Sequence, residues 1–189
     1  MRKSHLLFVL LLSICVCAEN YNFTRLDNSR GLSNNQITCT FKDSRGFVWF
    51  GSNYGLNRYD GYNIKVYKSI KNDTTSLPFN SISRIQEDAT GNLWINGNLW
   101  INSGTGGYVV YDIKKEKFIR SLSPFLATIG IKFIPSIVEI DQQKNYYFYN
   151  PSVGIYKYNV TTKKSKHFVQ TNDGTYKINP LVSINLNGI

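Results

Sequence analysis

Histidine and cysteine, the side chains most often used as nucleophiles, bases and metal ligands, are scarce in this sequence. The 189 residues contain two histidines and three cysteines, and only His167 and Cys39 lie outside an apolar N-terminal segment. With one of each there is no histidine–cysteine metal cluster and no evident nucleophile–base pair. We therefore expect no catalytic residue, no metal and no cofactor. We expect His167, which lies in a lysine-rich strand, to be solvated.

Two other features could suggest chemistry but have structural interpretations. Gly104–Gly107 superficially resembles a phosphate-binding loop, yet it lacks the lysine and the strand-to-helix context of such loops. Asp43 and Asp88 come just before tight turns, where an aspartate side chain can accept the backbone N–H two residues on. We interpret the glycine segment as an inter-strand turn and the two aspartates as turn residues.

Asparagine and aromatic residues in the loops are better candidates for binding than for catalysis. Amide groups form directional hydrogen bonds, and an aromatic ring offers an apolar stacking plane, a combination that suits neutral sugars. The alternative is that asparagine, glycine and serine simply favour turns. The candidate ligand-binding residues are Asn34, Asn35, Asn53, Tyr54, Phe79 and Asn80.

A four-strand pattern that recurs along the chain must position these loops. In its first copy, strands are expected at Ile37–Phe41, Phe47–Gly51, Gly55–Tyr59 and Ile64–Tyr67. The repeats cover about residues 31–75, 76–130 and 131–175, and a fourth begins within 176–189. A period of roughly 40–50 residues with four strands per repeat indicates a β-propeller blade. The predicted fold is all-β, an incomplete β-propeller of about three four-stranded antiparallel blades.

Two further strands are expected at the ends of this array. Tyr21–Leu26 alternates apolar and polar residues and is predicted to be a displaced outer strand, whereas Pro180–Ile184 is predicted to be the first strand of the fourth blade. Trp49 and Trp94 could be sugar-stacking platforms. Because they recur at one fixed place in the repeat, where Tyr147 stands in the third copy, we predict that they pack between blades.

The second repeat contains the same hexapeptide twice in tandem. Gly91–Asn96 and Gly97–Asn102 both read GNLWIN, and the sequence does not say which copy occupies the blade. Six is an even number, so a strand lengthened by one copy keeps the same side chains facing inward. We predict an overlong second strand or a hairpin that bulges from the second blade. Trp94 and Trp100 would not then be equally buried in a blade of normal length.

The N-terminus resembles an export signal. Arg2 and Lys3 precede the apolar run Leu6–Val16, which is about half the roughly 20 residues that span a bilayer. Lipoprotein processing would need a small residue before its cysteine, which is absent here, so cleavage after Ala18 is preferred. The predicted domains are a signal peptide at 1–18 and a partial propeller at 19–189, exported to the periplasm. The net charge of +10 comes from dispersed lysines, which suit solvated strand edges better than nucleic acid.

The repeats resemble the two-component regulator propeller repeat. The pattern D-x-x-G-x-L/V-W-I/F-G followed by G-L-x-R-Y-D is present at Asp43–Gly51 and Gly55–Asp60, after the lead-in Gly31–Ile37. The resemblance is strong in the first repeat, good in the second and faint in the third. It covers nearly all of residues 21–189.

The resemblance implies the periplasmic part of a hybrid histidine kinase in a polysaccharide-degrading bacterium. It implies an oligosaccharide ligand, membrane attachment only through regions absent from this chain, and leaves a homodimeric parent open. Three blades fall short of the roughly four to eight of a closed propeller, so we expect an N-terminal piece of a longer protein or a truncated reading frame. The alternative function is a secreted propeller that binds glycans or a fragment of a polysaccharide lyase.

Overall fold

The computed structural model describes residues 23–98, 107–171 and 174–178. Within these ranges the chain forms short antiparallel strands, one 3-10 helix, η1 (Asn28–Arg30), and one α-helix, α2 (Ser123–Thr128). No helix in the described ranges is long and apolar enough to cross a membrane. The predicted signal peptide lies outside the described residues.

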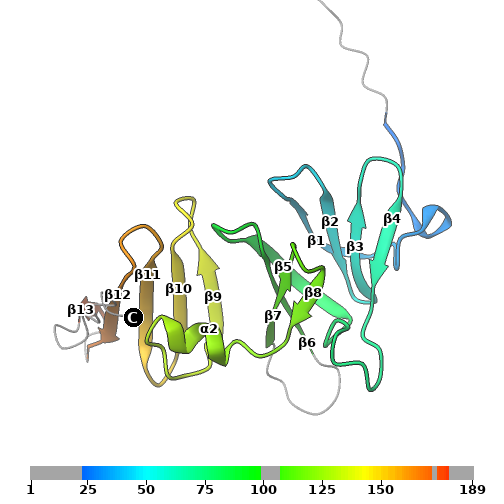
Figure 1. Ribbon diagram of the computed structural model, residues 1–189. Helices are drawn as coiled ribbons and strands as arrows, with labels where there is room; N and C mark the ends of the chain where they lie inside the picture. The colour runs from blue at the N-terminus through cyan, green and yellow to red at the C-terminus, as the bar shows by residue number, and fades with distance from the viewer. Residues whose placement is uncertain (1–22, 99–106, 172–173, 179–189) are drawn as a thin grey trace, which may run out of the picture.

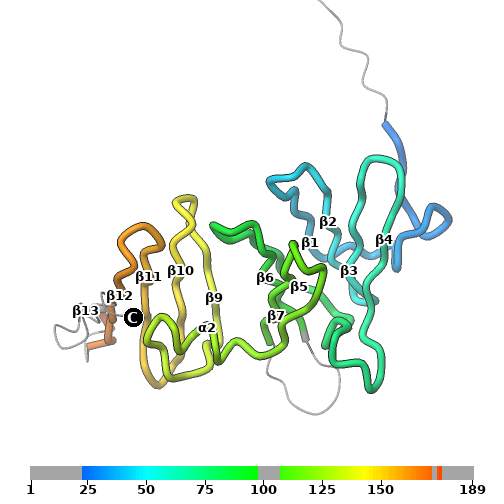
Figure 2. Tube along the Cα trace, in the orientation of Figure 1, coloured from blue at the N-terminus to red at the C-terminus, as the bar shows by residue number. Residues whose placement is uncertain are grey.

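Three antiparallel sheets follow one another along the chain and stand side by side (Figures 1 and 2). Sheet one contains β1 (Ile37–Lys42), β2 (Val48–Ser52), β3 (Gly55–Tyr59) and β4 (Ile64–Tyr67). Sheet two contains β5 (Ser81–Glu87), β6 (Leu93–Asn98), β7 (Gly107–Asp112) and β8 (Lys117–Ile119). Sheet three contains β9 (Ile137–Ile140), β10 (Tyr146–Asn150), β11 (Gly154–Asn159), β12 (Lys164–Gln170) and β13 (Tyr176–Ile178).

The predicted fold, an incomplete β-propeller, is confirmed. Within each sheet the strands pair in order of sequence, and the first strands β1, β5 and β9 are neighbours across the sheets. Each sheet is therefore a blade that packs face to face against the next blade along the chain. We call them blade one, blade two and blade three.

Both ends of the array differ from the prediction. The outer strand expected at Tyr21–Leu26 is absent over residues 23–27, because a strand must pair with a neighbour and no described strand pairs with this segment. At the other end, β13 adds an unpredicted fifth strand to blade three by pairing with β12. The fourth-blade strand predicted at Pro180–Ile184 lies outside the described residues.

A buried aspartate fixes the turn between the first and second strands of blades one and two. In blade one, Asp43 Oδ1 accepts the backbone N–H of Arg45 and of Phe47, both at 3.0 Å, and Oδ2 accepts Trp49 Nε1–H at 2.8 Å. Asp88 makes the corresponding bonds to residues 90, 92 and 94 of blade two. In blade three, the hydroxyl of Tyr147 donates to Asp141 Oδ2 at 3.2 Å. The structural role predicted for Asp43 and Asp88 is confirmed.

The two tryptophans pack between blades, as predicted. Trp49 is fully buried, and its ring centroid lies 5.8 Å from that of Tyr67 in its own blade and 5.6 Å from that of Tyr111 in blade two. The hydroxyls of Tyr67 and Tyr111 are 3.1 Å apart and form a hydrogen bond across the interface. Burial raises the pKa of Tyr111, so this bond joins two neutral phenols.

The second interface also contains the helix, which the sequence did not predict. Trp94 is 2% exposed and contacts Phe125 of α2 at 5.4 Å and Tyr146 of blade three at 5.3 Å between ring centroids. α2 begins at Ser123 with proline in its first turn, a recognised helix-start signal. It buries Leu126 against the same cluster.

The blade uses the first copy of the duplicated hexapeptide. Trp94, in the first copy, donates to Asp88, and the described part of β6 includes the first two residues of the second copy, Gly97 and Asn98. β6 pairs with β5 through a register shift at Ile82–Arg84, which matches the shift at Ile37–Cys39 in blade one. Trp100 lies outside the described residues, as do residues 99–106, where the predicted bulge would be.

One carboxylate ties the three blades together on the side of their first turns. Glu87 is 7% exposed, and its Oε1 accepts both the backbone N–H and the hydroxyl of Ser44 in blade one, at 3.0 and 2.6 Å. Lys144 of blade three donates to the Glu87 carbonyl oxygen at 2.9 Å and lies 3.4 Å from Oε2. This partly buried ionic contact links successive blades through the middle one.

Candidate functional site

The described part of the chain brings no cluster of metal-binding side chains together. Among the described residues, no group of three or more histidine, cysteine, aspartate or glutamate side chains could hold a metal ion. Cys39 is half-buried, and burial raises the pKa of its thiol, which disfavours the reactive thiolate. In the Gly104–Gly107 segment only Gly107 is described, and it begins β7.

The predicted solvation of His167 is wrong. Its side chain is 6% exposed, its ring stacks on Tyr156 at 4.1 Å between centroids, and its Nε2 lies 2.7 Å from the Val153 carbonyl oxygen. Burial alternates along the first residues of β12, and His167 lies on the same face of the sheet as Tyr156. The lysines beside it in sequence point to the other face, so local composition was misleading.

The predicted binding loops do meet along one edge of blades one and two. Asn53 Nδ2 donates to Gln36 Oε1 at 3.4 Å, and the hydroxyl of Ser81 donates to Asn53 Oδ1 at 3.1 Å. The hydroxyls of Ser33 and Ser52 are 3.0 Å apart. Asn53 thus joins the entry to β1 with the entry to β5. We call this surface the loop rim and define it as residues 33–36, 52–54 and 78–81.

Three asparagines of the loop rim use only one side of their amide to hold the loops. The Oδ1 atoms of Asn34, Asn35 and Asn80 accept the backbone N–H of residues 36, 28 and 69, at 2.6, 2.8 and 2.7 Å. Because an N–H donor selects the oxygen, each Nδ2 is the remaining group. No protein acceptor for these three Nδ2 groups is present among the described residues. The rim therefore holds amide donors in fixed positions.

The two aromatic candidates lie in opposite environments. Tyr54 is 60% exposed and follows Asn53 at the tip of the β2–β3 turn. Phe79 is 4% exposed and packs where a Cβ on Gly97 would lie 2.4 Å from its ring. Phe79 is consequently a core residue whose ring is not offered to a ligand, because Gly97 leaves room for it inside blade two.

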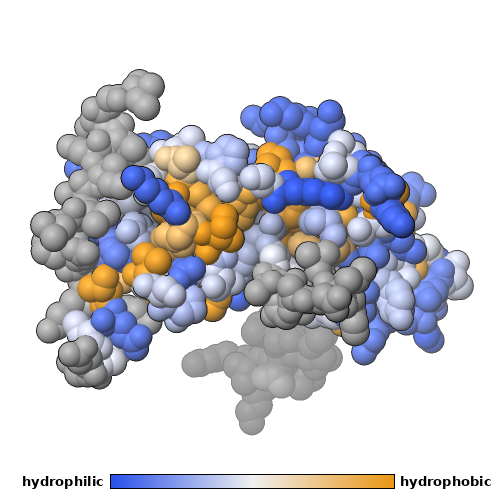
Figure 3. Space-filling model, turned by 90° about the horizontal axis from the view of Figure 1, so that it is seen from below, coloured by the Kyte–Doolittle hydropathy of each residue, from blue (hydrophilic) through white to orange (hydrophobic). Residues whose placement is uncertain are grey.

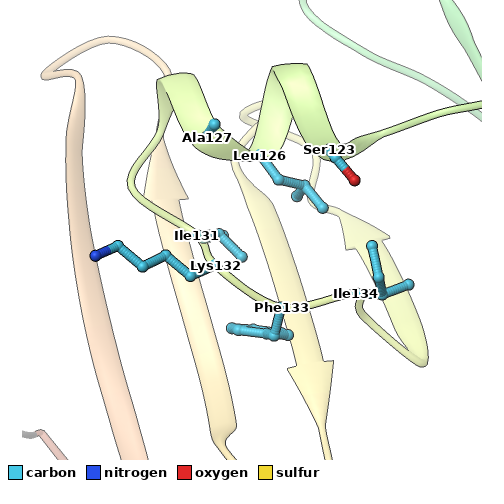
Figure 4. A pocket seen from close by; sticks show the side chains of 7 residues that line it. All are labelled: Ser123, Leu126, Ala127, Ile131, Lys132, Phe133 and Ile134. Atoms are coloured by element: carbon cyan, nitrogen blue, oxygen red, sulfur yellow. The ribbon is translucent and has the colours of Figure 1, made fainter.

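A hollow that the sequence did not indicate lies on the same side, between blades two and three. Tyr108, Arg120, Ser121 and Pro135 line a cavity of about 360 Å³. Ser123 and Ile134 also line an adjoining cavity of about 250 Å³ between α2 and the segment that follows it (Figure 4). Figure 3 shows hydrophobic residues gathered on this side over α2 and blade three. In the sequence, the apolar-rich run at residues 131–134 is the signal that could have indicated an exposed apolar surface here.

Arg120 and Tyr108 are fixed by bonds within the protein. The Arg120 guanidinium donates from Nε to the Ser76 carbonyl oxygen at 3.1 Å and from Nη2 to that of Asp73 at 2.7 Å. The hydroxyl of Tyr108 accepts the backbone N–H of Val138 at 2.9 Å. The hollow therefore has pre-positioned polar groups beside an apolar wall, a composition typical of ligand sites.

Comparison with known proteins agrees with the repeat pattern. The profile of the family described as two component regulator propeller matches residues 31–54 and 76–98, which contain the Asp43–Trp49 and Asp88–Trp94 units. Two segments of the chain are therefore similar to the two component regulator propeller repeat. Both matched segments run from the loop rim through the buried tryptophan strand.

Longer proteins contain regions similar to these propeller repeats. A histidine kinase of Formosa agariphila is 35% identical over 71 residues, which are 35% of this chain and 5% of that protein. Two solved extracellular domains of hybrid two-component systems from B. thetaiotaomicron are 17% and 18% identical, with TM-scores of 0.33 and 0.42. The similarity covers 84% and 85% of this chain and 29% and 31% of those domains. The chain thus spans a small part of the length of the proteins it matches.

Proposed function

We propose that this chain is the ligand-binding propeller of an exported two-component sensor. In this proposal, it recognises an oligosaccharide fragment at the loop rim in the periplasm. It then signals through a membrane-bound histidine kinase. The propeller acts by binding and performs no reaction. The propeller repeats support the sensor class, and the similarity to part of a histidine kinase is consistent with it.

The observation that carries the proposal is the set of fixed amide donors beside an exposed tyrosine. Asn34 and Asn80 each hold their Oδ1 in a backbone bond and keep Nδ2 as a donor, and Tyr54 is 60% exposed. Sugar hydroxyl and ring oxygens accept such donors, while the apolar face of a sugar stacks on an aromatic ring. Pre-positioned donors lose little conformational entropy when a ligand binds.

A glycan array probed with the purified chain tests this proposal. We expect selective retention of particular oligosaccharides, and we expect Tyr54→Ala to weaken it at least tenfold. Tyr62→Ala is the matched control, because Tyr62 is 92% exposed at the opposite end of β3. Equal loss in both variants, or no selective binding by a folded chain, would contradict a site at the loop rim.

Mass spectrometry of the bound oligosaccharide separates a sensor from an enzyme. We expect the oligosaccharide to be recovered intact after prolonged incubation with the chain. Recovery of shortened or unsaturated products would instead support a secreted glycan-degrading propeller.

A further inference from the structure

Blade one packs against blade two through one face of its sheet. The corresponding face of blade three, which lies on the side opposite blade two, has a similar arrangement of residues. Residues directly opposite each other on paired strands share a face of the sheet. In blade one, Trp49, Arg58 and Lys65 form one such row across β2, β3 and β4. In blade three, the corresponding row across β10, β11 and β12 is Tyr147, Lys157 and Lys166. We call these two the cationic rows.

The two cations of the row in blade one form ion pairs with a carboxylate of blade two. Glu116, in the turn between the third and fourth strands of blade two, accepts from Arg58 Nη1 and from Lys65 Nζ, both at 3.3 Å. The neighbouring cations hold the pKa of Glu116 below its usual range, Lys65 first and then Arg58. Arg58 also lies over the rings of Phe47 and Trp49, at 4.7 and 5.9 Å from their centroids. The contact therefore joins a packed aromatic–cation layer to an acidic turn.

Blade two supplies a comparison, because its row contains no cation. The row opposite Trp94 continues through Val110 and Ile119, and Phe125 of α2 packs against it. The third-to-fourth-strand turn of blade three, residues 160–163, contains no acidic residue. Within the described residues, a cationic row thus meets an acidic turn, and an apolar row meets a turn without acid.

The cationic row of blade three has no such turn against it among the described residues. Lys157 Nζ lies 4.9 Å from the centroid of the Tyr147 ring, as Arg58 lies over aromatic rings in blade one. Its one described acidic neighbour is Asp141 of the same blade, at 3.9 Å. Lys157, Lys164, Lys166 and Phe168 line a hollow of about 460 Å³ on this face. Glu139, directly opposite Tyr147 on β9, is paired with Arg84 of blade two at 2.6 Å. The three lysines therefore outnumber the remaining acid of this face, Asp141.

We propose that this face is an interblade surface that accepts a further four-stranded blade with a carboxylate in its third-to-fourth-strand turn. That carboxylate pairs with Lys157 and Lys166 as Glu116 pairs with Arg58 and Lys65. Phe168, which faces Ile155 as Tyr67 faces Leu56, packs against the aromatic residues of the added blade. The charge row thereby selects which blade can follow blade three.

A second copy of this chain is a poorer occupant by the same criterion. The free edge blade of such a copy would be blade one, whose third-to-fourth-strand turn contains Asp60 as its acidic residue. Its Oδ1 already accepts the backbone N–H of Tyr62 at 2.8 Å and of Asn63 at 2.6 Å. The equivalent Asp112 of blade two accepts Lys114 and Lys115 in the same way, so Glu116 is the additional acidic residue that blade one lacks.

A graft of this chain's own acidic blade tests the proposal. Residues 69–122, a second copy of blade two with its Glu116, are joined after Val169, which corresponds in register to Lys68. The grafted blade is prepared with and without the Glu116→Gln substitution. Each version is joined to two forms of the preceding chain, called hosts: the natural sequence and the Lys157→Gln/Lys166→Gln variant. Urea unfolding is followed at low and high salt. The same Glu116→Gln substitution in the natural blade two is the positive control.

We expect Glu116→Gln in the graft to lower the urea midpoint of the natural host by an amount comparable to the control. In the Lys157→Gln/Lys166→Gln host we expect no shift. The shift should shrink in about 1 M NaCl, where the Debye length falls to roughly 3 Å. Lys166 should also become protected from an amine-reactive reagent in the graft. Equal midpoints with and without the substitution in the natural host, or a shift that persists in the glutamine host, overturn the proposal.

A second host keeps the test decisive if the first graft does not fold cooperatively. Tyr147→Trp with Lys157→Arg gives the row of blade three the same aromatic residue and the same central cation as that of blade one. Failure of the graft in both hosts overturns the proposal. Concentration-dependent protection of Lys166 in the chain without a graft would identify a second copy as the occupant and would also overturn it.

Discussion

Trp49 donates its indole N–H to Asp43 Oδ2 at 2.8 Å, and both side chains are buried. The same carboxylate accepts two backbone N–H groups of the turn between β1 and β2. One aspartate therefore determines both the conformation of the turn and the depth at which the tryptophan enters the interblade core. Asp43 and Trp49 are six residues apart, and the same spacing and the same hydrogen bond recur in blade two at Asp88 and Trp94.

Replacement of Asp43 tests this coupling. Asp43→Ala should lower the free energy of unfolding by about 3 kcal/mol, because it leaves a buried indole N–H and two turn N–H groups without acceptors. Asp43→Asn keeps an acceptor oxygen and should cost less. Urea unfolding followed by tryptophan fluorescence measures both values. A loss no larger than that of Asp60→Ala, in an exposed turn, would contradict a special role for Asp43.

The ion pairs of Glu116 predict a pH dependence of interblade stability. Lys65 and Arg58 hold the pKa of Glu116 below its value in the unfolded chain, which is about 4.3. A depressed pKa contributes stability above the unfolded value, and this contribution is lost as the pH falls through the folded value. Glu116→Gln should thus be less stable than the natural chain at pH ~6, and the two should converge below about pH 4. A constant difference across this range would argue against the ion pairs.

Gly97 should be required for the packing of Phe79 in blade two. A Cβ at Gly97 would lie 2.2 Å from the Ser81 carbonyl oxygen and 2.4 Å from the Phe79 ring. Gly97→Ala should therefore destabilise the protein by about 1–3 kcal/mol, as overpacking does. Gly107→Ala is the matched control, since its Cβ would meet Phe79 at an ordinary 3.9 Å. Thermal unfolding of both variants measures the difference, and equal midpoints would show that blade two adapts freely.

The amide donors of the loop rim can be removed without disturbing the loops. Asn34→Asp and Asn80→Asp retain the oxygen that accepts Gln36 N–H or Ser69 N–H and replace the NH₂ donor by a negatively charged acceptor oxygen. We expect each to weaken oligosaccharide binding about fivefold to tenfold, the value of one or two hydrogen bonds, with unchanged unfolding. Titration calorimetry with a glycan selected on the array measures the affinity. Unaltered affinity in both variants would place the ligand elsewhere.

The sequence was sufficient to predict the four strands of blade one, because their signals are local. Gly55–Tyr59 and Ile64–Tyr67 were predicted with the bounds that β3 and β4 have in the structure. Turn residues and alternating apolar residues act over a few positions, and the repeat provides independent copies of each signal. The packing role of Trp49 followed from the same periodicity.

The environment of individual side chains was decided by contacts between distant segments. His167 was predicted to be solvated because lysines flank it, yet strand alternation and Tyr156 bury it. Phe79 was a candidate ligand-binding residue because its aromatic ring lies in a loop that enters a first strand. Gly97, in a different strand, leaves space that this ring fills.

The repeat by itself determined the architecture, and only the tertiary structure decided what each face of a blade meets. Asp43, Trp49 and the glycine turns are set by chain-local hydrogen bonds and can be read from spacing. Arg58 and Glu116, in contrast, are 58 positions apart, and nothing in their local sequence indicates that they form an ion pair. Their contact exists because two twisted sheets pack face to face, so the charges that close one blade interface emerge only when the blades are assembled.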